Sequence, residues 1–182
     1  GYAYSTLERP GQRFVTVDGQ VFKPGDEKKR LYPVHFCRVC GQEYHPVRLE
    51  SENGGRRFFA RDIDDAPIKR DPEDGAATTP PPASSEEAPD DPVEFGFLTL
   101  HPSDEAFEFA NEDDDYPEAW LEPDPRGNLR LKRNFREHRA REFLVEPDGK
   151  AGSGLKAWFL PGKFRFCLRC GDTQSSAARD RN

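Results

Sequence analysis

Short runs of apolar residues, separated by turn-forming residues, recur along this chain and predict β-strands. These runs are rich in β-branched and aromatic side chains, which fit the pleated surface of a sheet. They cover residues 31–36, 43–49, 56–61, 93–100, 143–145 and 156–166. In the last run, aromatic residues alternate with Lys163 and Arg165, which indicates a strand with one buried face. The pattern therefore predicts a mostly β, small α+β fold.

Turn and capping residues refine this prediction. Residues 13–23 place β-branched and aromatic residues on both sides of Asp18-Gly19, which is typical of a two-residue β-hairpin. A second turn is expected at residues 24–26. Residues 115–121 combine a capping aspartate with an early proline and favour one or two helical turns, which Trp120 would anchor to the core.

Four cysteines are present, and they form two similar CxxC motifs that lie far apart in the sequence. The motifs contain Cys37 and Cys40, and Cys167 and Cys170, and a glycine follows each second cysteine. Four thiolates satisfy the tetrahedral preference of Zn²⁺, and the glycines permit the positive φ of a tight knuckle. The spacing predicts one structural zinc site that brings the N- and C-terminal knuckles of an irregular, zinc-ribbon-like domain together.

Other roles for the cysteines are open at this point. Two disulfides are possible in an exported protein, although the chain shows no apolar signal segment and bonds within a knuckle have poor geometry. An iron–sulfur cluster also takes four cysteines, and a thiol-redox protein uses a reactive CxxC. His45 is a further candidate ligand. A closed four-cysteine site leaves no open coordination position, which argues against catalysis at the metal.

The length of 182 residues is typical of one domain, but the composition allows only a small core. Hydrophobic and charged residues each make up 34% of the chain, so burial offsets the ordering entropy of only part of it. Residues 64–92 are almost free of large apolar side chains and predict a flexible, Pro-rich and acidic loop. We expect one zinc-closed domain with an N-terminal hairpin and knuckle at 1–63, this loop, and the remaining strands and knuckle at 93–182.

Charge is segregated along the chain, although the net charge is only −7. Residues 86–124 contain fifteen Asp and Glu and no Lys or Arg, whereas residues 126–142 hold seven Lys or Arg. Basic side chains beside aromatic ones suit contact with a nucleic-acid backbone. The candidates are Arg130, Lys132, Arg133, Arg136 and Arg139. Alternatively, this stretch neutralises the acidic block, which is itself either a solvated face or a surface that recruits a partner protein.

No catalytic motif is recognisable. The chain contains no phosphate-binding P-loop, dinucleotide fingerprint, nucleophile elbow or HExxH motif. We therefore expect no catalytic residue in this segment. The chain has no run of membrane-spanning length and no targeting pattern, and its cysteines suit a reducing compartment, so we expect a cytoplasmic protein without membrane contact.

The two knuckles and their flanks resemble a known family. Residues 31–47 and 158–171, with an opening at residues 4–8, are similar to the cysteine-bearing insertion of large bacterial superfamily 2 DEAD/DEAH-box helicases, some of which belong to phage-defence gene clusters. The resemblance implies a parent chain that is an ATP-binding, ATP-dependent helicase acting on DNA or RNA. It places this segment between the two motor lobes, as an accessory zinc domain in which the four cysteines are the ligands. A start without methionine is expected of such a segment.

Overall fold

The computed structural model describes residues 2–62 and 93–173, and the predicted loop at 64–92 lies outside the described residues. It confirms a mostly β fold, in which every strand pairing is antiparallel. The strands are β1 (Tyr4–Thr6), β2 (Val15–Thr16), β3 (Phe22–Lys23), β4 (Asp26–Pro33), β5 (His35–Phe36), β6 (Glu43–Glu52), β7 (Gly55–Ala60), β8 (Glu94–Leu100), β9 (Leu121–Pro123), β10 (Leu129–Leu131), β11 (Arg141–Val145) and β12 (Leu155–Pro161). Three short 3-10 helices complete the described structure: η1 (Asp113–Asp115), η2 (Glu118–Trp120) and η3 (Arg133–His138).

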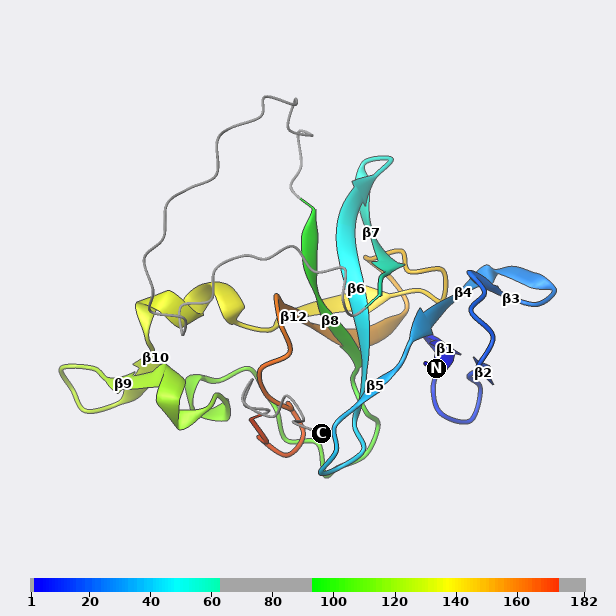
Figure 1. The fold of residues 1–182 in the computed structure, drawn as a ribbon. Coiled ribbons are helices and arrows are strands. Elements are labelled where there is room, and N and C mark those ends of the chain that lie inside the picture. The colour runs from blue at the N-terminus through cyan, green and yellow to red at the C-terminus, as the bar shows by residue number, and fades with distance from the viewer. Residues whose placement is uncertain (1, 63–92, 174–182) are drawn as a thin grey trace, which may run out of the picture.

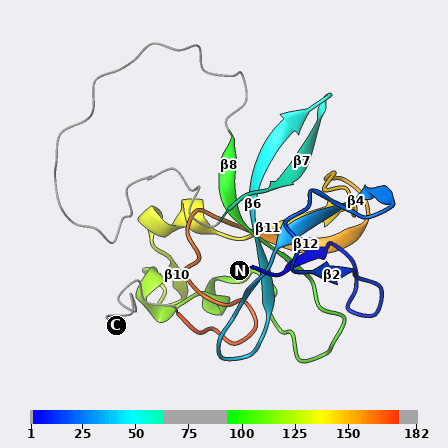
Figure 2. The ribbon, with the colours of Figure 1, turned by 45° about the vertical axis from the view of Figure 1, so that its right-hand side comes forward.

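The main sheet combines strands from both halves of the chain. Its order is β11-β12-β8-β6-β5, and β7 also pairs with β6. Figure 2 shows the long β6–β7 hairpin beside β8. Strand β6 pairs with β8 through His45↔Leu98 to Leu49↔Glu94, so the centre of the sheet joins residues that lie about fifty positions apart. A second sheet, of order β2-β1-β4-β3, and the small β9–β10 pair lie on either side of the main sheet (Figure 1).

Both faces of the main sheet are buried. Along β12, Trp158 and Leu160 pack into an aromatic cluster with the 3-10 helices, whereas Ala157 and Phe159 face a second cluster that includes Leu7 and other residues around the N-terminal sheet. The prediction of one buried face for residues 156–166 is therefore wrong. The basic residues Lys163 and Arg165 lie beyond the end of β12 at Pro161, so their alternation with aromatic residues does not describe the faces of this strand, which is covered on both sides.

The predicted hairpin around Asp18-Gly19 is also wrong. Strand β2 pairs with β1, and β3 pairs with β4, so the two segments do not pair with each other. A type I′ turn needs positive φ at its central residues. Gly19 does not have it, whereas Asn53 and Gly54 have φ of 50° and 78° and form the tight β6–β7 turn.

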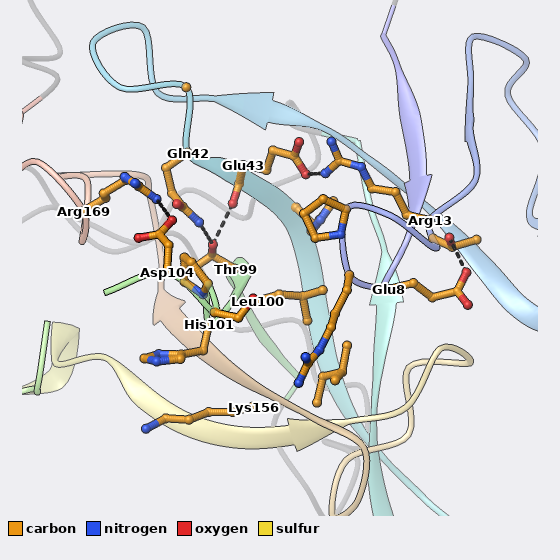
Figure 3. Close-up of a pocket in the computed structure, with 18 of the residues that line it drawn as sticks. Glu8, Arg13, Gln42, Glu43, Thr99, Leu100, His101, Asp104, Lys156 and Arg169 are labelled. Carbon is orange, nitrogen blue, oxygen red and sulfur yellow. Dashed lines mark hydrogen bonds and ion pairs between the residues drawn. The ribbon is translucent and has the colours of Figure 1, made fainter. Parts of the chain in front are cut away.

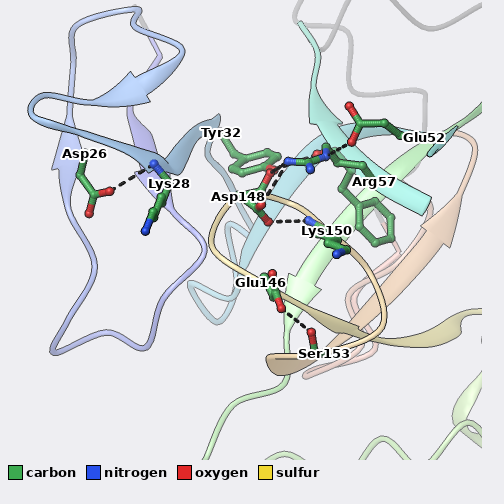
Figure 4. Close-up of polar contacts among 10 residues, drawn as sticks. Asp26, Lys28, Tyr32, Glu52, Arg57, Glu146, Asp148, Lys150 and Ser153 are labelled. Carbon is green, nitrogen blue, oxygen red and sulfur yellow. Dashed lines mark hydrogen bonds and ion pairs between the residues drawn. The ribbon is translucent and has the colours of Figure 1, made fainter. Parts of the chain in front are cut away.

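The turn after β11 connects the N-terminal sheet to the main sheet (Figure 4). The hydroxyl of Tyr32, in β4, donates a hydrogen bond of 2.8 Å to the carbonyl of Phe58 in β7. Arg57 forms an ion pair with Asp148 in that turn, at 3.2 Å. The backbone N–H of Arg30 donates to the carbonyl of Pro147 at 3.0 Å. Side-chain and backbone contacts thus fix the N-terminal sheet against one face of the main sheet.

Candidate metal centre

The first knuckle lies between β5 and β6, as the sequence predicts. Strand β5 pairs with the start of β6 through His35↔Tyr44 and Phe36↔Glu43, so the chain reverses across the CxxC motif. The backbone N–H of Gly41 donates to the carbonyl of Cys37 at 2.9 Å, and Gly41 has φ of 76°. A Cβ atom is strained at this φ, which explains the glycine.

The second knuckle follows β12 and repeats this geometry. The backbone N–H of Gly171 donates to the carbonyl of Cys167 at 2.8 Å, and Gly171 has φ of 73°. The backbone N–H of Cys167 donates to the carbonyl of Asp172 at 2.9 Å, as that of Cys37 does to Gln42 in the first knuckle. Two local sequences of the same kind therefore build two equivalent halves of one site.

The structure brings all four sulfur atoms together. They lie within 4.8 Å of one another, with Cys37 Sγ 3.7 Å from Cys170 Sγ and Cys40 Sγ 3.6 Å from Cys167 Sγ. A tetrahedron with metal–sulfur bonds of about 2.3 Å has edges of about 3.8 Å. The Cys37–Cys170 and Cys40–Cys167 distances match such edges. The cluster could hold one metal ion, and all four cysteines are free thiols rather than disulfides.

Without a bound cation, two of the four thiols resist deprotonation. Burial raises the pKa of the Cys167 thiol, and it raises that of Cys170 to about 12. Four thiolates at these distances repel one another unless a positive charge lies between them. A divalent ion reverses the effect of burial because it stabilises the deprotonated ligands.

A buried tyrosine, which sequence reasoning missed, supports the second knuckle. The hydroxyl of Tyr44 lies 3.3 Å from Cys167 Sγ and accepts a hydrogen bond of 2.8 Å from the backbone N–H of Leu168. Burial, followed by the Cys167 side chain, raises the pKa of Tyr44 far above its usual range, so its hydroxyl keeps the proton. The only signal in the sequence is a tyrosine three residues after Gly41, and that pattern does not reveal a partner 123 residues away.

The metal centre lies against the aromatic core. Cys37 and Cys167 are buried in the same cluster as Tyr44, Trp120 and Phe166. Cys40 and Cys170 lie nearer the solvent. Trp120 is buried at the end of η2, which confirms a helical turn and its anchor, but Asp115 belongs to η1 and the N-cap of η2 is Pro117 rather than the predicted aspartate. A change at the four-thiol cluster would therefore reach the core as well as the knuckles.

His45 is not one of the clustered ligands. It is 3% exposed, and its Nδ1 lies 3.0 Å from the carbonyl oxygen of Pro33. Burial lowers the pKa of His45 to about 4, so the ring is neutral at physiological pH. Because a carbonyl oxygen only accepts, Nδ1 carries the hydrogen.

The basic stretch is divided between internal contacts and solvent. Arg130 forms an ion pair with Glu122 at 3.0 Å, Arg139 pairs with Asp113 at 2.5 Å, and Lys132 donates to the carbonyl of Ala119. These contacts favour the view that the stretch neutralises the acidic block. Arg133 and Arg136 lie exposed on η3. They stay the candidates for contact with a phosphate backbone.

None of the described helices is long and apolar enough to cross a membrane. No family model, no curated protein and no solved structure matches this chain.

Proposed function

We propose that this chain is a zinc-clamped accessory domain of an ATP-dependent DEAD/DEAH-box nucleic-acid helicase. The observation that carries the clamp is the convergence of four thiols from two equivalent knuckles, at sulfur–sulfur distances that suit a tetrahedral ion. Zinc is the metal that four-cysteine sites of this spacing most often hold. The clamp would tie the β5–β6 hairpin to the segment after β12.

The metal acts through stability in this proposal. In the sequence, one ligand pair precedes β6 and the other follows β12, so binding the ion favours chains in which the strands between them have formed the main sheet. Binding free energy then becomes folding free energy, on the order of 10 kcal/mol in small zinc domains. A closed set of four protein ligands also leaves no position for substrate.

Metal content tests the clamp. Mass spectrometry of protein purified without added metal is expected to give one zinc per chain, and a strong chelator is expected to abolish the cooperative thermal melt. Cys40→Ser should lose the metal, whereas the control Val39→Ser, at an exposed neighbouring position, should keep it. Iron with visible absorbance, or an unchanged melt in metal-free protein, would overturn the zinc clamp.

The helicase context rests on the resemblance of the two knuckle segments, and the phage-defence context rests on it too. Within the domain, the exposed Arg133 and Arg136 support contact with DNA or RNA, because neither forms an ion pair with the described part of the acidic block, residues 93–124. They follow each other at a spacing of three on a 3-10 helix, so they lie on the same side of it. Such a pair would hold two phosphates of one strand.

Salt-dependent binding tests this contact. Arg133→Ala with Arg136→Ala is expected to weaken binding of single-stranded oligonucleotides and to reduce the slope of log K against log salt by roughly 1.4, for two single-strand phosphate contacts. The control double variant Lys28→Ala with Lys150→Ala removes the same charge at exposed positions outside the knuckles. Equal binding by both double variants would contradict the proposed contact.

A further inference from the structure

A pocket of about 360 Å³ lies beside the metal centre, between the N-terminal sheet and the main sheet (Figure 3). Its walls come from the loop after β1, the end of the first knuckle with the start of β6, the end of β8, and the start of β12. The volume equals that of about a dozen water molecules and falls within the range of small-molecule sites. The pocket borders the proposed clamp, since Cys40 lies in its wall, but the four-thiol cluster does not account for the rest of its lining.

The pocket walls carry more positive than negative charge, in a chain whose net charge is −7. They contain four Lys or Arg and three carboxylates. Each carboxylate already has a cationic partner: Glu8 pairs with Lys29 at 2.6 Å, Asp104 with Arg169 at 2.8 Å, and Glu43 with Arg13. The charge that the walls still offer to a ligand is therefore positive.

Arg9 is the basic side chain that best suits an anion. It is exposed and forms no ion pair with any described residue. The backbone N–H of Arg13 donates to the carbonyl of Arg9 at 3.0 Å, so a single turn places both arginines at the same wall. A guanidinium offers paired donors that match the oxygens of a phosphate.

Two fixed hydrogen-bond acceptors complement this cation. In His45, Nδ1 donates to the carbonyl of Pro33, so Nε2 of the neutral ring is an acceptor. In Gln42, Nε2 donates to Thr99 Oγ1 at 2.8 Å, because the Thr99 hydroxyl donates its own hydrogen to the carbonyl of Glu43. This orientation leaves Oε1 of Gln42 as an acceptor. Both residues line the pocket, and no described residue donates to either atom.

The remaining walls supply apolar surface. Pro10, Leu100 and Leu155 line the pocket. A ligand that matches the cation, the two acceptors and the apolar side chains carries an anionic group, N–H donors, and a flat or apolar body between them.

We propose that this pocket binds a nucleoside 5′-monophosphate, with the phosphate at Arg9, the base N–H donors at His45 and Gln42, and the base against Leu100 and Leu155. The same chemistry is presented by a free mononucleotide and by the phosphorylated 5′ end of a strand. The site goes beyond the proposed function, because it uses neither Arg133 nor Arg136. Binding at this site would also not depend on a helicase motor in the parent chain.

Calorimetric titration of the metal-loaded protein tests the site. The probes are the four nucleoside 5′-monophosphates, with the matching nucleosides and inorganic phosphate as partial ligands. At least one monophosphate should bind saturably, and more tightly than its nucleoside or phosphate alone. Arg9→Gln should weaken binding about tenfold to a hundredfold, the loss expected for a hydrogen bond to a charged group. Arg126→Gln, an exposed arginine outside the pocket and the knuckles, is the control and should change nothing.

A second variant tests whether binding needs the volume of the pocket, without changing the charge of its walls. Ser103 is exposed at the pocket wall, so Ser103→Trp should fold normally and fill the site. It should abolish binding while the charge is unchanged. Competition by a 5′-phosphorylated oligonucleotide, but not by its 5′-hydroxyl form, would identify a strand end as the source, and its absence would identify the free nucleotide. The absence of saturable binding by all four monophosphates, or binding that Arg9→Gln and Ser103→Trp leave unchanged, would overturn the proposal. Neither result depends on the salt slope of oligonucleotide binding.

Discussion

The hydroxyl of Tyr44 lies 3.3 Å from the sulfur of Cys167, although the two residues belong to opposite halves of the metal centre. Tyr44 is in β6, just after the first knuckle, and Cys167 opens the second. The same oxygen accepts a hydrogen bond from the backbone N–H of Leu168. One buried side chain therefore aligns the second knuckle on the first, independently of any ion.

We expect Tyr44→Phe to weaken both metal binding and stability. It leaves the buried N–H of Leu168 without its acceptor, which costs about 1–3 kcal/mol of unfolding free energy. Loss of a hydrogen bond to a metal ligand typically lowers metal affinity about 10- to 100-fold. Competition with a chromophoric chelator and urea unfolding measure the two effects.

Tyr116→Phe is the matched control for this prediction. The hydroxyl of Tyr116 accepts a hydrogen bond of 2.9 Å from the backbone N–H of Ala140, in a buried position without contact to a cysteine. It should lower stability by a similar amount and leave metal affinity unchanged. Equal metal affinities for wild type and Tyr44→Phe would show that Tyr44 only packs.

Gly96→Ala is expected to destabilise the centre of the main sheet. A Cβ atom at this position would lie 2.3 Å from the carbonyl oxygen of Leu160 and 2.7 Å from the ring of Phe159. Overpacking of this kind costs about 1–3 kcal/mol or more. Gly55→Ala is the control, since its Cβ atom would meet nothing closer than 3.7 Å. Urea midpoints of the two variants should differ clearly, and equal midpoints would contradict the packing described.

Stability should fall in mild acid because of His45. Burial lowers its pKa in the folded chain to about 4, whereas the unfolded chain has the ordinary value of about 6.5. The unfolded state therefore binds the proton more readily. The contribution of neutral His45 to the unfolding free energy is complete only above about pH 6.5. Arg13 adds to the shift by its charge. Between pH 7 and 5.5 the unfolding free energy should fall by about 1 kcal/mol through this group.

His45→Gln isolates this effect. The variant lacks the titrating ring, so the pH dependence of its unfolding free energy should be shallower over the same range. Metal content must be equal for both proteins at each pH, which mass spectrometry checks. Parallel pH profiles would show that His45 does not titrate in this way.

The ion pair between Arg139 and Asp113 should contribute little to stability. Their side chains are 38% and 33% exposed, and partly exposed pairs contribute about 0.2–1 kcal/mol. A double-mutant cycle of Arg139→Ala and Asp113→Ala measures this coupling. A positive coupling would support neutralisation of the acidic block, and zero coupling would return Arg139 to the candidates for nucleic-acid contact.

The strands and knuckles could be predicted from local sequence because each depends on nearby residues. The Asn53-Gly54 turn forms since both residues tolerate positive φ, and the knuckle glycines mark Gly41 and Gly171 in the same way. Four cysteines in two CxxC motifs were enough to predict their convergence, which the structure confirms.

The errors concern pairing between distant segments. Asp18-Gly19 has the composition of a hairpin turn, yet β1 and β4 take the two flanking strands as partners. Local composition does not show which of several strands a segment will pair with. Tyr44 and the pocket walls were missed for the same reason, since each joins residues from separate parts of the chain.

The position of the second knuckle near residue 170 means that its two cysteines are synthesised long after those of the first knuckle. Cys167 and Cys170 are synthesised after every described strand of the main sheet. Contacts across such long sequence separations form slowly because loop closure precedes them. A nascent chain that ends before residue 167 thus holds only two of the four thiols. The complete four-thiol cluster can therefore form only after synthesis has passed the second knuckle.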